Sequence, residues 1–515
     1  RQPVAVQAAA PAAAPAGGIG MQQLLQLLAS TGGAQPITGH AAPRNIDSTL
    51  SRAVQSIALA GSSCNLPGSC SPRVFWDACV SGCDLVGTVP LSRWDAHVND
   101  FSSDAERRAQ YGAFISGVEL FDHVRFGIAF NEAGAMDPQQ RMLLEHGYES
   151  FYLTDTHEGL SGRNVGFSVG IYSVEFGQIL AQIPAGRSVY AATGSALSIA
   201  SGRVSYVLGL QGPCVSVETA CSAALVAAHG ALRSLQNNEC ELHLVSGVNL
   251  MLLPAASLGF SIAGMTSPAG RSHTFDIRAD GFVRGEGCCS VVVQPSMVAC
   301  EFRGSSVRQD GRSASLTAPN GQAQQLLLRA AVADASIGVA ALKGCETHGT
   351  GTALGDPIEA SALASGVLGE RQHRSFALGG VKATLGHTES AAGLTGVVKL
   401  LAGLDHSAWA PNAQLRCLNP HVLSALRGRA SAMPTQLAPL ENTARSGSSF
   451  GVSSFGYSGT IAHSVLALMR SKLPQKFPVT FKRHLHAWRA EVHPLLQRAP
   501  VLHSGESRFR TPCTG

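Results

Sequence analysis

The amino-acid sequence predicts an α/β protein whose sheets are buried between helices. Short strand-like runs such as Val215–Val217, Leu242–Val245 and Ser290–Val293 alternate with longer stretches rich in Ala and Leu. Continuous apolar runs of this length are typical of strands that are covered on both faces. Hydrophobic residues make up 45% of the 515-residue chain and charged residues only 14%, so a large core can form.

The ordered fold is expected to begin near Gln55, because the apolar run Ile57–Gly61 predicts a first strand. Residues 1–54 precede it and are of low complexity, rich in Ala, Pro, Gln and Gly. This composition cannot bury a core and indicates a linker. Within it, Met21, Leu24, Leu25 and Leu28 have the spacing of a short amphipathic helix.

Two helices have explicit start signals. Asp137 and Asp356 each precede a Pro and stand three residues before a Gln or Glu, in Asp-Pro-Gln-Gln and Asp-Pro-Ile-Glu. An Asp at the cap, Pro at the first position and Gln or Glu at the third is a typical helix start. The sequence therefore predicts helix caps at both aspartates. At the other end of the chain, residues 469–515 are basic and poorly periodic, which indicates a linker after the domain.

Composition excludes several classes of function. The 38 Lys and Arg against 34 Asp and Glu give a net charge of +4, too slight and dispersed for nucleic-acid binding. No apolar run approaches the roughly 18 residues of a membrane span. Thirteen cysteines form neither a dense disulfide framework nor a regular zinc spacing, so no metal site is predicted. Reduced thiols favour an intracellular compartment, cytoplasmic or plastid.

The candidate nucleophile is Cys221. Residues 213–218 read as a strand and residues 222–236 as a helix, which places Cys221 at the turn between them. Free N–H groups at a helix N-terminus lower the pKa of a thiol and stabilise an oxyanion. The flanking Ala220 and Ser222 are small enough for a substrate to approach closely. We therefore expect a nucleophilic thiol here, with a lowered pKa.

Two histidines and a lysine complete the candidate site. His348 and His387 each follow an apolar run and precede a Gly-containing turn, as expected for donors at the ends of adjacent strands. Neutral imidazoles in such positions hydrogen-bond a thioester carbonyl and stabilise an enolate. Lys382 lies five residues before His387, and Glu389 two residues after it. We expect Lys382 to pair with Glu389 and to supply a held cation.

Further motifs run in order along the chain. They are Ser71-Pro72 with Phe75-Trp76, Met136–Arg141, Ser201–Tyr206, Ala279–Gly287 and Ser453–Thr460. Together with the cysteine and histidine segments, they resemble the ketosynthase (β-ketoacyl synthase) domain of type I modular polyketide synthases. That family belongs to the thiolase-fold condensing enzymes. The resemblance covers about 55–468 and implies a duplicated αβαβα architecture in five layers. Residues 55–300 would then be the nucleophile half and 301–468 the His/His/Lys half.

The resemblance implies an acyltransferase that performs a decarboxylative Claisen condensation in polyketide or fatty acid biosynthesis. Cys221 would take an acyl chain, with its own N–H and that of Tyr457 as the oxyanion hole. His348 and His387 would hold the enolate of a malonyl-type extender. Tyr457 would also gate the acyl pocket, and Phe455 would support the site.

The same resemblance implies partners and a second binding region. Thr350 and Thr352 match residues that hydrogen-bond a phosphopantetheine arm, so the substrates would be carried by an acyl carrier protein. No bound cofactor is implied. A homodimer is implied, as are other domains or proteins of a polyketide synthase.

The sequence departs from the family pattern at a few positions. Glu218 replaces the usual Asp, and Ala223 and Ala224 replace Ser. Ile461 replaces the Asn of Gly-Thr-Asn-Ala-His, which removes an amide that could anchor the gating loop. An inactive ketosynthase-like partner, which binds carriers or sets chain length, therefore stays open as an alternative. A degradative thiolase would need a second catalytic cysteine near Ser453–Thr460, where there is none.

Overall fold

The computed structural model describes residues 56–95, 103–154, 159–172, 175–295, 300–370, 375–440, 448–468 and 478–489, and the backbone of 497–498 and 509–510. The chain divides into units Arg1–Ala53 and Val54–Gly515. All described residues belong to the second unit. The predicted linker and helix before Gln55 lie outside them.

One mixed sheet of eleven strands runs through the domain, and its two halves have the same topology. The order is β13-β11-β10-β15-β16-β9-β1-β8-β7-β5-β6. The first half contains β1 (Ile57–Asn65), β5 (Val165–Ile171), β6 (Cys214–Val217), β7 (Leu242–Asn249) and β8 (Gly287–Pro295). The second contains β9 (Cys300–Gln309), β10 (Leu342–Glu346), β11 (Phe376–Gly379), β15 (Ser449–Phe455) and β16 (Thr460–Leu468), with β13 (Ser431–Ala432) at its edge.

In each half the first strand of the chain pairs antiparallel with the fifth, and the fifth with the fourth. The fourth, second and third strands are then mutually parallel, as β7-β5-β6 and as β15-β10-β11. β1 and β9 join the two halves. The predicted duplication is therefore confirmed in the strand order.

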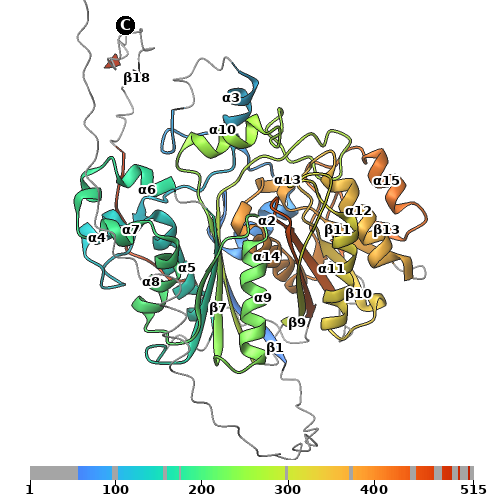
Figure 1. Cartoon of the computed structure of the whole chain (residues 1–515), viewed down its shortest axis with the longest axis horizontal. Helices are drawn as coiled ribbons and strands as arrows, with labels where there is room; N and C mark the ends of the chain where they lie inside the picture. The colour runs from blue at the N-terminus through green and yellow to red at the C-terminus, as the bar shows by residue number, and fades with distance from the viewer. Residues whose placement is uncertain are drawn as a thin grey trace, which may run out of the picture. The chain divides into compact units, whose positions relative to one another are not determined.

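Helices complete the five predicted layers (Figure 1). The central layer, between the half-sheets, holds α9 (Ala223–Gln236) and α14 (Ala392–Asp405), which contact strands of both. One outer layer holds α5 (Pro138–Tyr152) and α8 (Leu197–Leu208), packed on the first half. The other holds α11 (Gly321–Asp334) and α12 (Gly355–Gly366), where α11 covers β9 and β16. The αβαβα prediction is confirmed.

Shorter elements surround this framework. They are α2 (Pro72–Val80), α3 (Asp104–Ala109), α4 (Phe130–Ala135), α6 (Glu175–Leu180), α7 (Ala191–Gly194), α10 (Pro254–Ile262), α13 (Lys382–Leu385), α15 (Pro420–Leu426), β2 (Gly87–Thr88), β3 (Tyr111–Gly112), β4 (Leu120–Phe121), β12 (Ala408–Trp409), β14 (Ala438–Pro439), β17 (His484–Leu485), β18 (Gln497–Arg498) and β19 (Phe509–Arg510).

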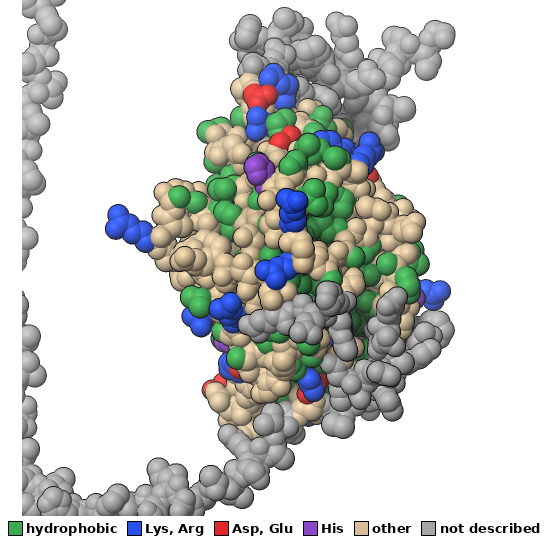
Figure 2. Space-filling view, turned by 90° about the vertical axis from the view of Figure 1, so that its right-hand side faces the viewer, with side chains coloured by type: hydrophobic (Ala, Val, Ile, Leu, Met, Phe, Trp, Pro, Cys, Tyr) green, Lys and Arg blue, Asp and Glu red, His purple; other side chains and the backbone are tan. Residues whose placement is uncertain are grey.

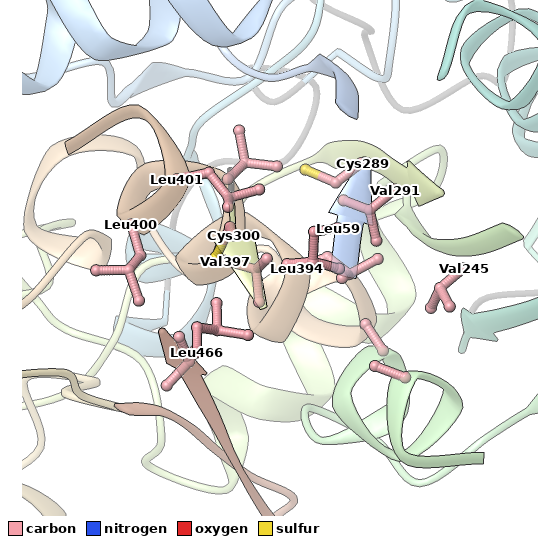
Figure 3. Close-up of a cluster of buried hydrophobic side chains, with 14 of the residues drawn as sticks. Leu59, Val245, Cys289, Val291, Cys300, Leu394, Val397, Leu400, Leu401 and Leu466 are labelled. Carbon is pink, nitrogen blue, oxygen red and sulfur yellow. The ribbon is translucent and has the colours of Figure 1, made fainter. Parts of the chain in front are cut away.

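The largest core cluster lies around α14. Leu394, Val397 and Leu401 of this helix pack among side chains of β1, β7, β8, β9 and β16 (Figure 3). Because strands cover it on both sides, α14 is apolar nearly all round, as expected of a fully buried helix. Because α14 packs against strands of both half-sheets, it fixes the ends of these strands relative to one another.

One of the two predicted helix caps is wrong. The Asp137 carboxylate accepts the Gln139 N–H at 2.8 Å, so α5 begins as predicted. α12, however, begins at Gly355, which puts Asp356 inside its first turn. The Asp356 carboxylate instead accepts the N–H groups of Phe275 and Gly351, at 2.7 and 3.0 Å. It ties two loops to the helix rather than capping it.

Part of the predicted C-terminal linker is packed against the domain. β17 pairs antiparallel with β4, and Arg483 bonds Glu145 of α5 at 2.8 Å. Trp488 is buried in the core cluster of the first half. Residues 478–489 are thus attached to the domain, whereas most of the rest of 469–515 lies outside the described residues.

Charged side chains are few and scattered on the face of the molecule shown in Figure 2. On this face, Lys and Arg side chains are scattered among apolar and neutral ones.

Within the described residues, no helix is both long and apolar enough to cross a membrane. The twelve cysteines in this part of the chain are all free thiols.

Candidate active site

The predicted site residues line one cavity of about 440 Å³ between the halves of the domain. Cys221 comes from the first half, and His348 and His387 come from the second. Five phenylalanine and tyrosine side chains share the lining, and these are Tyr172, Phe260, Phe282, Phe455 and Tyr457. Thr350 and Thr352 line it as well, while Lys382 lies buried behind it. The structure therefore brings the predicted residues together.

Cys221 stands at the predicted turn, between β6 and α9. The turn requires Ala220 at a φ of 54°, a left-handed conformation that costs energy in a residue other than Gly. Ser454 of β15 donates its hydroxyl to the Cys221 carbonyl at 2.6 Å. Gly456 lies against the same turn, where a Cβ would come within 2.5 Å of the Thr219 carbonyl oxygen. The second half of the domain thus holds the backbone of the nucleophile.

The predicted lowering of the thiol pKa is wrong. Burial, with a further contribution from the Glu389 carboxylate, raises the pKa of Cys221 to about 12. Lys382 and the backbone N–H groups of Tyr457 and Cys221 act in the opposite direction but do not outweigh burial. These two N–H groups are the ones expected from the sequence to form an oxyanion hole.

His348 is held by the backbone of β15. The Phe455 N–H donates to His348 Nδ1 at 3.2 Å, so a neutral ring carries its proton on Nε2. Burial lowers the pKa of His348 well below its usual value, and the positive charge of Lys382 lowers it further. The bond at Nδ1 and the lowered pKa both favour the neutral Nε2–H donor that the sequence predicts at His348.

His387 has the same arrangement. The Glu389 N–H donates to its Nδ1 at 3.3 Å, and its Nε2 is buried without a partner. Burial lowers the pKa of His387 well below its usual value, with Lys382 and Arg284 acting in the same direction. The ring centroids of His348 and His387 are 5.5 Å apart, at an interplanar angle of 84°. Two neutral Nε2–H donors therefore belong to one cavity.

The predicted pairing of Lys382 with Glu389 is wrong. Glu389 forms a buried ion pair with Arg284, whose Nε and Nη2 lie 2.5 and 3.1 Å from the two carboxylate oxygens. The planar guanidinium matches a carboxylate with two parallel bonds, which an ammonium cannot do. Burial lowers the pKa of Lys382. The carboxylates of Glu359 and Glu346 act in the opposite direction and are the strongest influences that raise it.

Sequence reasoning missed several buried charges that position the histidines. The Glu359 carboxylate accepts the N–H groups of His348 and Gly349 at 2.7 and 2.8 Å. Glu346, at the end of β10, accepts the Val381 N–H at 2.6 Å and pairs with Lys399 at 2.8 Å. An acid at the end of an apolar strand, directly before Thr347 and His348, was the available signal.

A short loop with Tyr457 at its tip borders the cavity. Tyr457 is 38% exposed and packs edge-on against Phe260, at a centroid distance of 5.9 Å. Gln309 donates its Nε2–H to the Ser458 carbonyl at 2.9 Å, and the Asp310 N–H donates to the Gly459 carbonyl at 2.8 Å. The end of β9 thus anchors this loop. The hydroxyls of Thr350 and Thr352, which also line the cavity, are 3.2 Å apart.

The departures from the family pattern fit their surroundings. Ala223 and Ala224 are fully buried, and β5 approaches so closely that a Cβ on Gly170 would lie 2.4 Å from the Ala224 nitrogen. The Glu218 carboxylate accepts the Ala220 N–H at 3.1 Å. Ile461 is fully buried and packs with Phe455 and with Ala323 and Leu327 of α11.

Two family models match the chain in succession. The β-ketoacyl synthase N-terminal domain matches residues 54–299, and the β-ketoacyl synthase C-terminal domain matches residues 299–416. Among curated proteins, one of the phenolphthiocerol/phthiocerol polyketide synthase subunits of Mycobacterium tuberculosis is 40% identical over 427 residues. These residues are 80% of this chain and 27% of that protein, so the chain spans about a quarter of that relative's length.

Solved ketosynthases share the fold. The ketosynthase from module 6 of the bacillaene synthase of Bacillus subtilis is 33% identical, with a TM-score of 0.74 over 82% of this chain and 73% of that chain. The oxazolomycin ketosynthase domain of Streptomyces albus is 28% identical, with a TM-score of 0.75 over 83% of this chain and 76% of that chain. The chain belongs to the β-ketoacyl synthase family of acyltransferase-class condensing enzymes and is related to the ketosynthase domains of modular polyketide synthases.

Proposed function

We propose that this chain condenses a malonyl-type extender onto an acyl chain held on Cys221, by decarboxylative Claisen chemistry. One observation carries the proposal. Two neutral histidines, each fixed through Nδ1 so that the proton is on Nε2, line the same cavity as a cysteine with two backbone N–H groups beside its sulfur. A hydrolase would need a histidine that can accept the proton of the nucleophile, whereas these rings are built to donate.

In the first step, the Cys221 sulfur attacks the carbonyl of an incoming acyl thioester. The N–H groups of Cys221 and Tyr457 stabilise the oxyanion of the tetrahedral intermediate. The carrier thiolate leaves and takes up the proton that the Cys221 thiol gives up, which leaves a thioester on Cys221. Because burial keeps the resting thiol protonated, Lys382 assists by stabilising the transient thiolate.

In the second step, a malonyl-type thioester loses carbon dioxide, and the electron pair of the broken carbon–carbon bond becomes an enolate. The Nε2–H groups of His348 and His387 both donate to the enolate oxygen. The enolate carbon attacks the acyl-Cys221 carbonyl and a carbon–carbon bond forms. The Cys221 thiolate leaves and takes up a proton from solvent. Neutral donors suit this step, because a charged imidazolium would protonate the carbanion.

Both substrates would arrive on the phosphopantetheine arm of an acyl carrier protein. The paired hydroxyls of Thr350 and Thr352 line the cavity and suit the amides of such an arm. The relatives are much longer than this chain, so we propose that it works beside further polyketide synthase domains or proteins. The product, polyketide or fatty acid, depends on those partners.

We further propose a homodimer that forms through the β6 edge of the sheet. Among the strands that the structure describes, β6 pairs only with β5, and Cys214 and Val215 on it are exposed. Tyr206 of the adjacent α8 is 87% exposed. An edge strand whose outer side is unpaired, with exposed apolar side chains beside it, favours pairing with a second copy. A monomer at micromolar concentration in light-scattering measurements would contradict this proposal.

The enzymatic proposal is tested by formation of an acyl-enzyme. Incubation with a panel of acyl-pantetheine thioesters, followed by intact-mass analysis, should give a mass increase of one acyl group that is absent in Cys221→Ala. A thiol-directed ketosynthase inhibitor should label the same residue. If no thioester loads Cys221, the chain is a ketosynthase-like carrier-binding partner. The raised thiol pKa and Ile461 are the observations that favour this second candidate.

A further inference from the structure

The cavity contains two polar atoms that the mechanism does not use. Among its described lining residues, three have a buried side-chain nitrogen or oxygen without a hydrogen-bond partner. They are His387 Nε2, Asp310 Oδ1 and Gln324 Oε1. The first is the donor assigned to the enolate. The other two are acceptors.

These acceptors stand out against the other acids of the lining. Asp280 accepts the hydroxyl of Ser267, and Glu389 pairs with Arg284. Asp356 and Glu359 each accept two backbone N–H groups. Buried acceptors are almost always paired in proteins, so two unpaired ones in a substrate cavity point to a ligand.

Asp310 and Gln324 are firmly placed. Asp310 ends the β9 region, where its N–H bonds the Gly459 carbonyl and its carbonyl accepts Asn320 Nδ2 at 2.7 Å. Gln324 lies on α11 and is 1% exposed, next to Ala323, which packs on Ile461. At Ile461 the family pattern has an asparagine, whose amide is a hydrogen-bond donor. Ile461 brings no donor to this part of the cavity wall.

We propose that Asp310 and Gln324 form an acceptor subsite that selects an acyl chain bearing a hydroxyl or N–H donor. The inference rests on the proposed function and specifies its substrate class. A donor on the acyl chain would supply at least one of these oxygens with the hydrogen bond that it lacks. A saturated acyl chain would leave both buried oxygens without a hydrogen-bond donor, which disfavours its loading relative to a donor-bearing chain.

Matched thioesters test the proposal. Hexanoyl-pantetheine is compared with its 3-hydroxy and 5-hydroxy analogues, and the initial rate of acyl-Cys221 formation is followed by intact mass. We expect at least one hydroxy analogue to load faster by on the order of tenfold, the effect of one hydrogen bond. The ratio of the hydroxyhexanoyl to the hexanoyl loading rate should fall close to one in Gln324→Met, which keeps the side-chain length. Asp310→Leu should have the same effect. Gln322→Met, an exposed position on the same helix, should leave the ratio unchanged.

The outcomes are distinguishable. Equal loading of all three chains, or a ratio unchanged in Gln324→Met, overturns the subsite but leaves the condensing function intact. If no chain loads Cys221, the proposed function fails and the subsite with it. The comparison is repeated with N-acetylcysteamine thioesters, which lack most of the pantetheine arm. If the preference for a hydroxyl persists with these shorter thioesters, it supports recognition of the acyl chain. A preference for the arm alone would show that the acceptors bind the arm instead, and would overturn the proposal.

Discussion

The two halves of the domain share a strand order but use the same position for different chemistry. In each half the third strand along the chain lies beside the second, as β6 beside β5 and β11 beside β10. Cys221 follows the third strand of the first half, and His387 follows the third strand of the second. Because of the duplication, the nucleophile Cys221 and the proposed enolate donor His387 occupy equivalent positions in the two halves, and both line the same cavity.

The halves differ in how they hold these groups. Cys221 is placed by backbone: a left-handed Ala220, a carbonyl bonded by Ser454 and N–H groups near the sulfur. The histidine rings also accept backbone N–H groups at Nδ1, but buried acidic side chains anchor their loops in addition: Glu389, paired with Arg284, and Glu359, which accepts the His348 N–H. A nucleophile must approach a carbonyl along one direction, which a rigid turn provides. Donors to an enolate must stay neutral, which burial of the two rings favours by lowering their pKa values, and the nearby cations Lys382 and Arg284 act in the same direction.

The largest expected effect concerns the thiol. Because the pKa of Cys221 is raised to about 12, its alkylation by iodoacetamide should rise about tenfold per pH unit, roughly a thousandfold between pH 7 and pH 10. Peptide mapping would follow modification at this residue alone. A plateau near pH 8 would show instead that the backbone N–H groups already stabilise a resting thiolate.

The buried ion pair between Arg284 and Glu389, next to His387, can be removed by changing Arg284. Arg284→Met leaves the Glu389 carboxylate buried without its ion pair, which should lower the free energy of unfolding by about 3–5 kcal/mol. Urea denaturation measures this. Arg107→Met, at an exposed surface pair with Asp104, is the control and should leave the free energy of unfolding nearly unchanged. Equal effects would mean that buried charge does not position this half.

A smaller effect is expected at Glu359. Glu359→Gln places an amide N–H₂ where a carboxylate oxygen now accepts a backbone N–H, so we expect a loss of about 1–3 kcal/mol. Malonyl decarboxylation should fall along with stability, since His348 loses its anchor. Glu239→Gln, at an exposed position, is the matched control. Unchanged decarboxylation in Glu359→Gln would show that the Phe455 N–H is sufficient to hold the ring.

The contrast also explains what the sequence could predict. Cys221 and its turn were predictable, because the strand, the small residues and the helix are local. The Lys382–Glu389 pairing failed because closeness in sequence was a poor guide: Arg284, about a hundred residues earlier, reaches Glu389 first. The thiol pKa failed because a local helix effect was weighed without the burial that only the assembled fold imposes. Both predictions were wrong because they depended on tertiary structure: one on which cation reaches Glu389, and the other on how deeply Cys221 is buried.

The central claim is that the two halves perform separable steps. The most direct test compares acyl loading and malonyl-thioester decarboxylation in Cys221→Ala, His348→Ala and His387→Ala. We expect Cys221→Ala to lose loading but retain decarboxylation. Each histidine variant should lose decarboxylation by about 10²–10³-fold, the effect of removing one oxyanion donor, and retain loading. If His348→Ala abolishes loading as completely as Cys221→Ala does, His348 is the base of the thiol and the division between the halves is wrong.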